Sequence, residues 1–491
     1  EVEEEKEMNV VIVGGGTAGW MTTAALCKTF SDWDITIIEG GESIGVGEST
    51  TPHINQYLKY MEIDDETFLR EARATYKSSS RFQDFSKVGE VFHYPNGQSI
   101  RADVSYHEWM YAKAMGYEVP PFAELFMPFV TVAEQGKLPL NNHLISPYQI
   151  EKDRSFHIDA SSFCTYLRKY CDNAKLITDK VTNVKYERVM QGSKDKRIHH
   201  LVVNGQEIYA DLFIDCTGQS SVLFDKTSDW IPYDNILTDT ALVTKVDYST
   251  NIEEEMVAYT NAQGKTAGWQ WTIPTWDFIS KGFVYSSKFQ SEKDAAEEFG
   301  YEEYRKIEFK QGRHDRAWTA NCVAIGLSYG FIEPLESTSL FNTHHGILAL
   351  IDILKQDALP GQFARDRYNY NLAEHMDGWR EFVEAHYYYS RRRDTPFWRH
   401  VTDEIEYEIS GAHKVILQAM VTGEEIPHGE DPIVYILAGS GYTNVNERLN
   451  RYFNDWVDFD TQKWITHHNA VKKLAEQMPT MHEHLKEEIW A

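Results

Sequence analysis

The chain has 491 residues, 42% of them hydrophobic, and is long enough for a large core divided over two or three domains. Lys and Arg number 48 against 75 Asp and Glu, and the net charge of −27 opposes binding to nucleic acids and anionic membranes. No apolar run approaches the ~20 residues that cross a bilayer. The acidic start EVEEEKE does not resemble a secretion signal. We therefore expect a cytoplasmic protein without nucleic-acid or membrane partners.

The cysteines and histidines predict neither disulfides nor a metal site. The cysteines are odd in number, and no two form a CxxC pair; they are Cys27, Cys164, Cys171, Cys216 and Cys322. The histidine pairs at 344–345 and 467–468 do not have metal-ligand spacing either. We expect reduced, mostly buried thiols and no metal.

The most informative stretch lies near the start. Asn9–Val13 is a short β-branched run, and a glycine turn, a helical segment and a second apolar run follow it. Gly14, Gly16 and Gly19 form the pattern GxGxxG, and Glu39 closes the second run. These are the marks of a βαβ unit that binds a dinucleotide: the glycines admit the pyrophosphate, and the acidic residue bonds a ribose hydroxyl.

Later segments indicate that this nucleotide fold is interrupted. ADLFIDCTG at 210–218 and NCVAIGLSYGFIEP at 321–334 each read as a buried strand that runs into a glycine turn. The segment GESIGVGEST at 41–50 suits a strap along a flavin, so FAD is favoured over NAD. We expect an α/β fold with a Rossmann-like FAD-binding domain, an inserted β-rich substrate region and a helical C-terminal region.

The domain limits follow from this pattern. The FAD-binding core is expected over 8–340, with substrate-binding segments interleaved at about 80–210 and 225–320. A mainly helical region is expected over 341–491, covering the substrate side.

Several residues have simple structural interpretations when taken alone. In a strand, Trp269, Trp271 and Ile273 share one face and Pro274 ends the pairing, which is typical of core packing. Lys77 reads as a solvated charge, and Glu336 as a helix cap or an ion-pair partner. The turn that follows Glu336 also offers backbone donors for an anion.

Taken together, the motifs give the chain a strong resemblance to the flavin-dependent halogenases of the tryptophan-halogenase family, from about residue 8 to about 460. The WxWxIP string after an FAD fingerprint separates this family from flavin monooxygenases. The resemblance rests on GGGTAGW (14–20), GVGEST (45–50), YKSSSRF (76–82), FHIDASSFCTYLRKYC (156–171), DLFIDCTGQSSVL (211–223), GWQWTIP (268–274), GLSYGFIEPLESTSL (326–340) and HYYYSRRRDTPFW (386–398).

The resemblance implies a reaction in which FADH2 and O2 convert a bound halide to hypohalous acid, which travels through a tunnel to a separate substrate pocket. Lys77 matches the catalytic lysine, which holds that oxidant by hydrogen bonding or as a haloamine. Glu336 matches the catalytic glutamate, which polarises the oxidant and takes the arene proton. Thr338 and Ser339 match the halide site. Trp269 and Trp271, with Ile273 and Pro274, match the partition that keeps substrate from the flavin.

The cofactors and partners implied are FAD, a chloride, bromide or iodide ion, and O2. A separate reductase is expected to supply FADH2, because no second nucleotide fingerprint for NAD(P)H is apparent. A homodimer is expected by family resemblance alone. The cofactor-binding residues carried over are Gly14, Gly16, Thr17, Ala18, Gly19, Glu39, Gly47, Ser49 and Gly326.

The expected substrate is an electron-rich indole, phenol or related heteroarene rather than free tryptophan. Family members that act on tryptophan carry His-Pro-Phe-Gly, whereas the comparable stretch here is FHYPNG, with His93, Tyr94, Pro95 and Asn96 as pocket candidates. Many relatives have glycine where this chain has Ser339, so we expect bromide or iodide to serve at least as well as chloride. The alternative function is a flavin-dependent aromatic hydroxylase of the same fold.

Overall fold

The computed structural model describes residues 8–41, 47–97, 106–145, 148–189, 196–408, 433–442 and 460–490, with a few isolated positions between 411 and 418. The chain forms two compact units, each assembled from three separate segments. The first unit comprises Glu1–Arg73, Ile158–Ile236 and Glu308–Arg380; the second comprises Ala74–His157, Leu237–Ile307 and Glu381–Ala491. The α/β class predicted from the sequence is confirmed.

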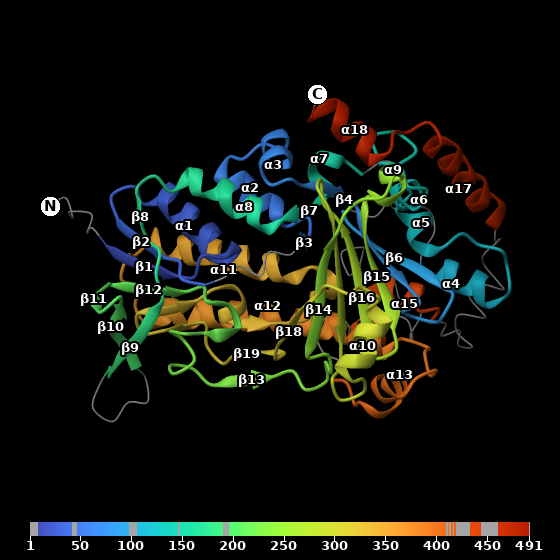
Figure 1. Ribbon diagram of the computed structural model, residues 1–491. Coiled ribbons are helices and arrows are strands. Elements are labelled where there is room, and N and C mark those ends of the chain that lie inside the picture. The colour runs from blue at the N-terminus through green and yellow to red at the C-terminus, as the bar shows by residue number, and fades with distance from the viewer. Residues whose placement is uncertain are drawn as a thin grey trace. The chain divides into compact units, whose positions relative to one another are not determined.

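The first unit is built on a six-stranded sheet with the order β20-β21-β12-β1-β2-β8, and Figure 1 labels β12, β1, β2 and β8. All neighbours are parallel except β20 and β21. The central strand β1 is buried on both faces, as expected of an apolar run in a parallel sheet. The strands are β1 (Asn9–Val13), β2 (Asp34–Ile38), β8 (Ala174–Ile177), β12 (Leu212–Asp215), β20 (Trp318–Thr319) and β21 (Cys322–Ala324).

Helices and two small sheets complete this unit. Helix α1 packs against both α8 and α11, and the three lie beside one another in Figure 1. The helices are α1 (Thr17–Thr29), α2 (Ile54–Met61), α3 (Asp65–Glu71), α8 (Ala160–Leu167), α11 (Thr338–Leu354) and the start of α12 (Gln362–Tyr388). The small sheets consist of β9 (Val181–Arg188), β10 (Lys196–Val203) and β11 (Gln206–Ile208), and of β13 (Trp230–Pro232), β19 (Gly312–His314) and β22 (Gly330–Phe331).

The second unit contains a seven-stranded sheet with the order β18-β14-β17-β16-β15-β5-β6. Its strands pair antiparallel from β14 to β15 and again from β5 to β6, whereas β15 and β5 are parallel. Leu242, Phe283 and Tyr285 form a core with Ala295 and Phe299 of helix α10 (Glu292–Phe299). The strands are β5 (Ser79–Gln83), β6 (Val91–Pro95), β14 (Thr240–Val246), β15 (Tyr259–Lys265), β16 (Gly268–Pro274), β17 (Ile279–Tyr285) and β18 (Arg305–Glu308).

A short ladder and several helices complete the second unit. Strand β4 (Thr75–Lys77) pairs antiparallel with the start of β7 (Ser155–Asp159). The helices are α4 (Tyr106–Ala114), α5 (Phe122–Phe126), α6 (Phe129–Glu134), α7 (Ile150–Asp153), α9 (Ile252–Glu255), α13 (Pro396–Arg399), α15 (Ile433–Gly439), α17 (Thr461–Ala475) and α18 (Met481–Glu488). The expected C-terminal helices are therefore present, although most of the one expected at 408–420 lies outside the described residues.

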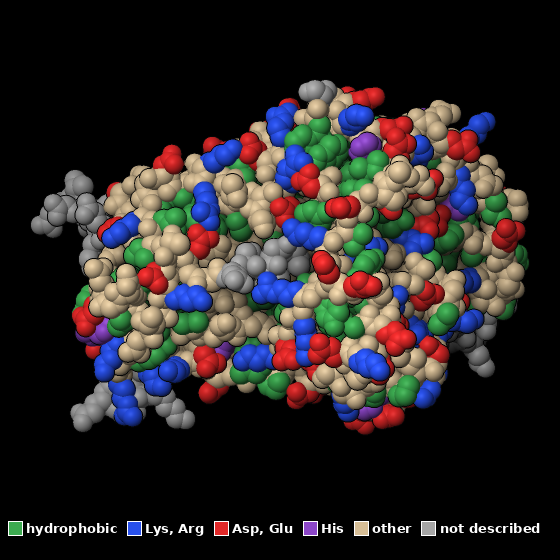
Figure 2. All heavy atoms as spheres, in the orientation of Figure 1, with side chains coloured by type: hydrophobic (Ala, Val, Ile, Leu, Met, Phe, Trp, Pro, Cys, Tyr) green, Lys and Arg blue, Asp and Glu red, His purple; other side chains and the backbone are tan. Residues whose placement is uncertain are grey.

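The surface carries many charged side chains (Figure 2), and the cysteines are buried. On the face drawn in Figure 2, acidic and basic side chains are interspersed. Among the helices that the structure describes, none is both long and apolar enough to span a bilayer. All five cysteines are buried free thiols, as predicted.

Candidate active site

The glycine loop of the first unit leaves open space at one position only. A Cβ on Gly14 (φ +121°) would lie 2.2 Å from the Cys216 carbonyl oxygen, and one on Gly19 would lie 1.8 Å from the Gly14 carbonyl oxygen. Both glycines are therefore required by packing. A Cβ on Gly16 would meet no atom of the described chain within 4 Å. Gly16 precedes α1, so the loop and the helix N-terminus leave the room that a pyrophosphate needs.

Glu39 lies where the fingerprint predicts, directly after β2. Its backbone N–H bonds the Ile177 carbonyl, and its carboxylate forms an ion pair with Arg168 at 2.7 Å. The Arg168 guanidinium in turn lies 4.4 Å from the Trp20 ring centre. Sequence reasoning missed Arg168, because it lies on a segment far from the fingerprint. Glu39 therefore lies at the position expected to bind the ribose, and its carboxylate also forms an ion pair with Arg168.

Asp215, at the end of β12, organises the loops behind the glycine turn. This buried carboxylate accepts hydrogen bonds from the backbone N–H groups of Thr217 (2.9 Å) and Leu223 (2.7 Å), and from the Ser328 hydroxyl (3.0 Å). Gly326 adopts φ +68°, and a Cβ there would lie 3.0 Å from the Ala18 Cβ. Gly326 therefore allows close approach to α1, while its role in binding the cofactor stays a prediction.

The strap predicted at 41–50 is described only at its ends, since residues 42–46 lie outside the described part. Its last residues form β3 (Gly47–Ser49). The Thr17 hydroxyl donates to the Glu48 carboxylate at 3.0 Å. Burial raises the pKa of Glu48 to about 7; the Thr17 hydrogen bond opposes this and the Asp159 charge adds to it. The end of the strap therefore contacts the start of α1 through Glu48. Glu48 was not among the site residues predicted from the sequence.

The segment around Glu336 forms a tight turn into α11. Ser337 takes the left-handed conformation (φ 59°), and Thr338 is the first helical residue. The Glu336 side chain is buried. The Thr338 hydroxyl is also buried, and no hydrogen-bond partner for it is found among the described residues. An unpaired buried hydroxyl at the N-terminus of a 17-residue helix suits a small anion, so these residues fit the expected halide. Ser339 is half-buried beside it.

Lys77 belongs to the second unit, where it is only 2% exposed, so its interpretation as a solvated charge is wrong. It ends strand β4 opposite Ser155 of β7. Its carbonyl accepts hydrogen bonds from the Asn96 amide at 3.0 Å and the Ser155 hydroxyl at 3.2 Å. Both of these groups therefore fix the backbone that carries the lysine.

The tryptophans of GWQWTIP line one face of β16 in the same unit. Trp269, Trp271 and Ile273 are all buried, and the two indoles lie 6.1 Å apart. A Cβ on Gly282 would lie 2.0 Å from the Trp271 ring, so this glycine of the neighbouring strand makes room for the indole. The packing predicted from the alternation is confirmed, while the partition role stays a prediction.

The candidate pocket residues on β6 are held by protein groups. His93 bonds the Ser79 hydroxyl through Nδ1 and the Glu134 carboxylate through Nε2, both at 2.9 Å. Arg81 forms an ion pair with the same carboxylate at 2.8 Å. Tyr94 packs edge-on against Phe382, with ring centres 5.2 Å apart, and Pro95 pairs with Ser79 in the sheet. Their contact with a substrate stays a prediction.

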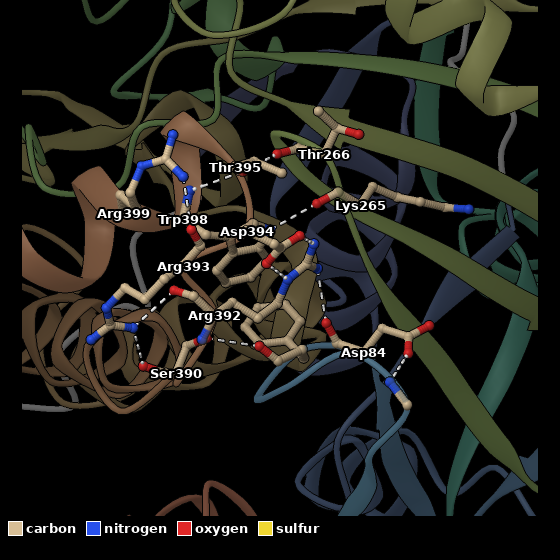
Figure 3. Close-up of polar contacts among 12 residues, drawn as sticks. Asp84, Lys265, Thr266, Ser390, Arg392, Arg393, Asp394, Thr395, Trp398 and Arg399 are labelled. Carbon is tan, nitrogen blue, oxygen red and sulfur yellow. Dashed lines mark hydrogen bonds and ion pairs between the residues drawn. The ribbon is translucent and has the colours of Figure 1, made fainter.

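The motif HYYYSRRRDTPFW forms a clamp on the turn between β15 and β16. Figure 3 shows the Arg392 guanidinium between the Asp394 carboxylate (2.7 and 2.9 Å) and the Asp84 carbonyl (2.8 Å). The guanidinium also lies 4.4 Å from the Trp398 ring centre. The Trp398 indole N–H donates to the Lys265 carbonyl at 2.8 Å, and the Thr395 hydroxyl to the Thr266 carbonyl at 2.8 Å. This motif therefore fixes the hairpin that carries Trp269 and Trp271.

The predicted site residues divide between the two units. The glycine loop, Glu39, Gly326, Glu336 and Thr338 belong to the first; Lys77 and the tryptophans belong to the second. Each group of residues is described within its own unit. Among the described residues, no group of three or more His, Cys, Asp or Glu side chains is arranged to hold a metal ion.

Comparison with known proteins identifies the family. The tryptophan halogenase family model matches residues 9–485. Tryptophan 6-halogenase SttH from Streptomyces toxytricini is 32% identical over 479 residues, which span 88% of this chain and 89% of that protein. The VirX1 apo structure has a TM-score of 0.90 at 33% identity and covers 99% of this chain and 100% of its own. Xcc4156, a flavin-dependent halogenase from Xanthomonas campestris, has a TM-score of 0.83 at 26% identity over 98% of each chain. The chain belongs to the tryptophan halogenase family and is an enzyme of the flavin-dependent halogenase class.

Proposed function

We propose that this halogenase delivers an oxidised halogen to a small electron-rich arene through Lys77, with FADH2 supplied by a separate reductase. The observation that carries the proposal is the burial of Lys77, at 2% exposure, in the unit that also carries the tryptophans of GWQWTIP. Burying an ammonium is costly unless it is paired and hydrogen-bonded, so a lysine this deeply buried is uncommon. A lysine held away from water is suited to retain hypohalous acid by a hydrogen bond or to form a haloamine with it.

The first unit supplies the groups expected to hold the cofactor and halide. FAD, when bound in reduced form, supplies the electrons with which O2 is converted into an oxidant of halide. The open space at Gly16 suits the pyrophosphate, and Glu39 suits the adenosine ribose. The Thr338 hydroxyl and the N-terminus of α11 suit a halide. Glu336, two residues before Thr338, is the proposed acid–base residue.

The proposed substrate is an indole, phenol or related heteroarene. Such rings stabilise the positive charge that develops when a carbon–halogen bond forms, and they release a proton to complete the substitution. SttH is named as a tryptophan 6-halogenase. In this chain, Asn96 stands where the His-Pro-Phe-Gly stretch has phenylalanine, and its amide donates hydrogen bonds to the Lys77 carbonyl and the Ser155 hydroxyl. This supports a substrate other than free tryptophan.

The test is a reconstituted reaction. Purified protein is combined with FAD, a flavin reductase, NADH and halide, and a panel of indoles, phenols, anilines and free tryptophan is assayed by mass spectrometry. We expect halogenated products, with simple indoles or phenols turned over faster than tryptophan. Products that carry only an added hydroxyl group would favour the aromatic hydroxylase instead. Preferential turnover of tryptophan would contradict the substrate proposal alone.

A further inference from the structure

The ladder that carries Lys77 places four polar side chains on one face. Thr75 pairs with His157, and Lys77 pairs with Ser155. Residues two apart on a strand point to the same side, so Thr75, Lys77, Ser155 and His157 share a face. Tyr76 and Phe156 stack on the opposite face, with ring centres 5.8 Å apart. His157 is fully buried and lies diagonal to the lysine.

Hydrogen bonds connect His157 to two strands of the seven-stranded sheet. The Thr75 hydroxyl donates to the Pro274 carbonyl at 2.6 Å and lies 3.3 Å from His157 Nδ1. His157 Nε2 lies 2.9 Å from the Thr260 hydroxyl. Thr260 belongs to β15, and Pro274 ends β16, the strand of GWQWTIP. One imidazole thus links the Lys77 strand to both strands of the tryptophan hairpin.

The direction of these hydrogen bonds follows from the number of protons available. Because the Pro274 carbonyl only accepts, Thr75 uses its single hydroxyl proton there. Thr75 therefore accepts from the Nδ1–H of His157. In a neutral imidazole, Nε2 is then an acceptor, which receives the Thr260 hydroxyl proton. The inferred order of donation is Thr260, His157, Thr75, Pro274.

The surroundings keep this imidazole neutral. Burial lowers the pKa of His157 well below its ordinary value, and the positive charge of Lys77 adds to the effect, while the Pro274 carbonyl opposes it. A neutral ring has one donor and one acceptor, which matches a donor side that faces Thr75 and the Pro274 carbonyl and an acceptor side that faces Thr260. The ring therefore does not compete with Lys77 as a second cation.

We propose that Thr75, oriented by His157, is a positioning residue for Lys77, whose strand it holds in register with the end of the GWQWTIP strand through its hydrogen bond to the Pro274 carbonyl. The inference rests on the proposed role of Lys77 in halogen delivery. If the register slips, the oxidant is still formed but reaches the arene less often. The expected signature is therefore uncoupling rather than loss of flavin oxidation.

The matched pair Thr75→Val and Thr75→Ser tests this link. Valine removes the hydroxyl with little change of shape, whereas serine keeps it. The measurements are FADH2 oxidation, halogenated arene, hypohalous acid released to a soluble trap, and the melting temperature. We expect Thr75→Val to give about tenfold less halogenated arene per FADH2 oxidised, because small misplacements of catalytic groups are costly. Its FADH2 oxidation should stay unchanged, its released oxidant should rise, and Thr75→Ser should stay close to wild type.

Two results would overturn the inference while wild type remains active. The first is a Thr75→Val enzyme that forms as much halogenated arene per FADH2 oxidised as wild type. The second is a Thr75→Ser enzyme that loses as much of this yield as Thr75→Val, which would assign the effect to packing. Where Thr75→Val fails to fold, Thr260→Val removes the donor at the other end of the chain and should uncouple in the same direction. A wild-type enzyme without halogenated product would overturn the proposed function itself.

Discussion

Arg392 offers a direct test of how the tryptophan hairpin is held. Its side chain is 5% exposed, and its guanidinium contacts the Asp84 carbonyl, the Asp394 carboxylate and the Trp398 ring. A Cβ on Gly264 would lie 2.6 Å from one guanidinium nitrogen, so the arginine packs directly on β15. Arg392→Met keeps most of the aliphatic stem and removes every polar contact.

The magnitude follows from these contacts. A buried charged hydrogen bond to a carbonyl contributes about 2 kcal/mol, and a desolvated cation–aromatic contact about 1 kcal/mol. The half-exposed Asp394 carboxylate adds little after solvent screening. We therefore expect Arg392→Met to lose about 3 kcal/mol, which lowers the melting temperature of a unit of this size by roughly 5 °C.

The matched control is Arg391→Met, the neighbouring arginine, whose side chain is 42% exposed and pairs with Glu90 at the surface. Differential scanning calorimetry of both variants and wild type, with urea unfolding for the free energy, measures the difference. The hydrogen bond from Arg392 lowers the pKa of Asp394. The small stability that this ion pair adds is therefore present above the ordinary pKa of the carboxyl group and is lost as Asp394 is protonated at lower pH. If Arg392→Met melts within about 2 °C of Arg391→Met, the clamp does not stabilise the hairpin.

Three further predictions follow from the two units. Gly16→Val should leave the melting temperature of the apo protein unchanged yet weaken FAD binding, because its side chain fills open space. The control is Gly361→Val, which also places a side chain in open space. If Gly16→Val binds FAD as tightly as Gly361→Val in a fluorescence titration, the prediction is wrong. Hydrogen bonds from His93 and Arg81 outweigh burial and lower the pKa of Glu134 to about 2. Glu134→Gln should therefore cost about 2 kcal/mol at pH 7 by urea unfolding, and the difference should shrink as pH falls from about 4.5 towards 2, where Glu134 is protonated; a pH-independent difference would refute the linkage. Halide competition should give brominated or iodinated arene at least as readily as chlorinated arene, and Ser339→Gly should shift the product ratio towards chloride; strict chloride preference in wild type would sink this idea.

The glycine turn and the burial pattern of β16 were predictable because residues close together in the sequence determine them. Gly14 and Gly19 occur at fixed spacing because β1 and α1 meet at a tight turn, and their packing needs are visible in the spacing itself. The alternation of GWQWTIP likewise predicted which side chains of β16 are buried.

Long-range contacts were not predictable in this way. Arg168 bonds Glu39, Asp215 bonds Ser328 and His157 bonds Thr260, and nothing beside these residues in the chain marks such distant partners. Lys77 shows the same limit, since its neighbours in sequence include a run of serines that suggests a solvated loop, whereas strand pairing buries it. Its role came from family resemblance, and its burial from the structure.

The most direct test of the account compares Lys77→Ala with Lys281→Ala in the reconstituted reaction. Lys281 lies on β17 in the same unit, and its ammonium bonds the Thr272 hydroxyl at 2.9 Å. The readouts are FADH2 oxidation and halogenated arene in the same sample. The account predicts that Lys77→Ala oxidises FADH2 at the wild-type rate but forms no halogenated arene, while Lys281→Ala forms product as wild type does. Halogenation by Lys77→Ala at the wild-type rate would contradict the central claim that the halogen reaches the arene through this lysine.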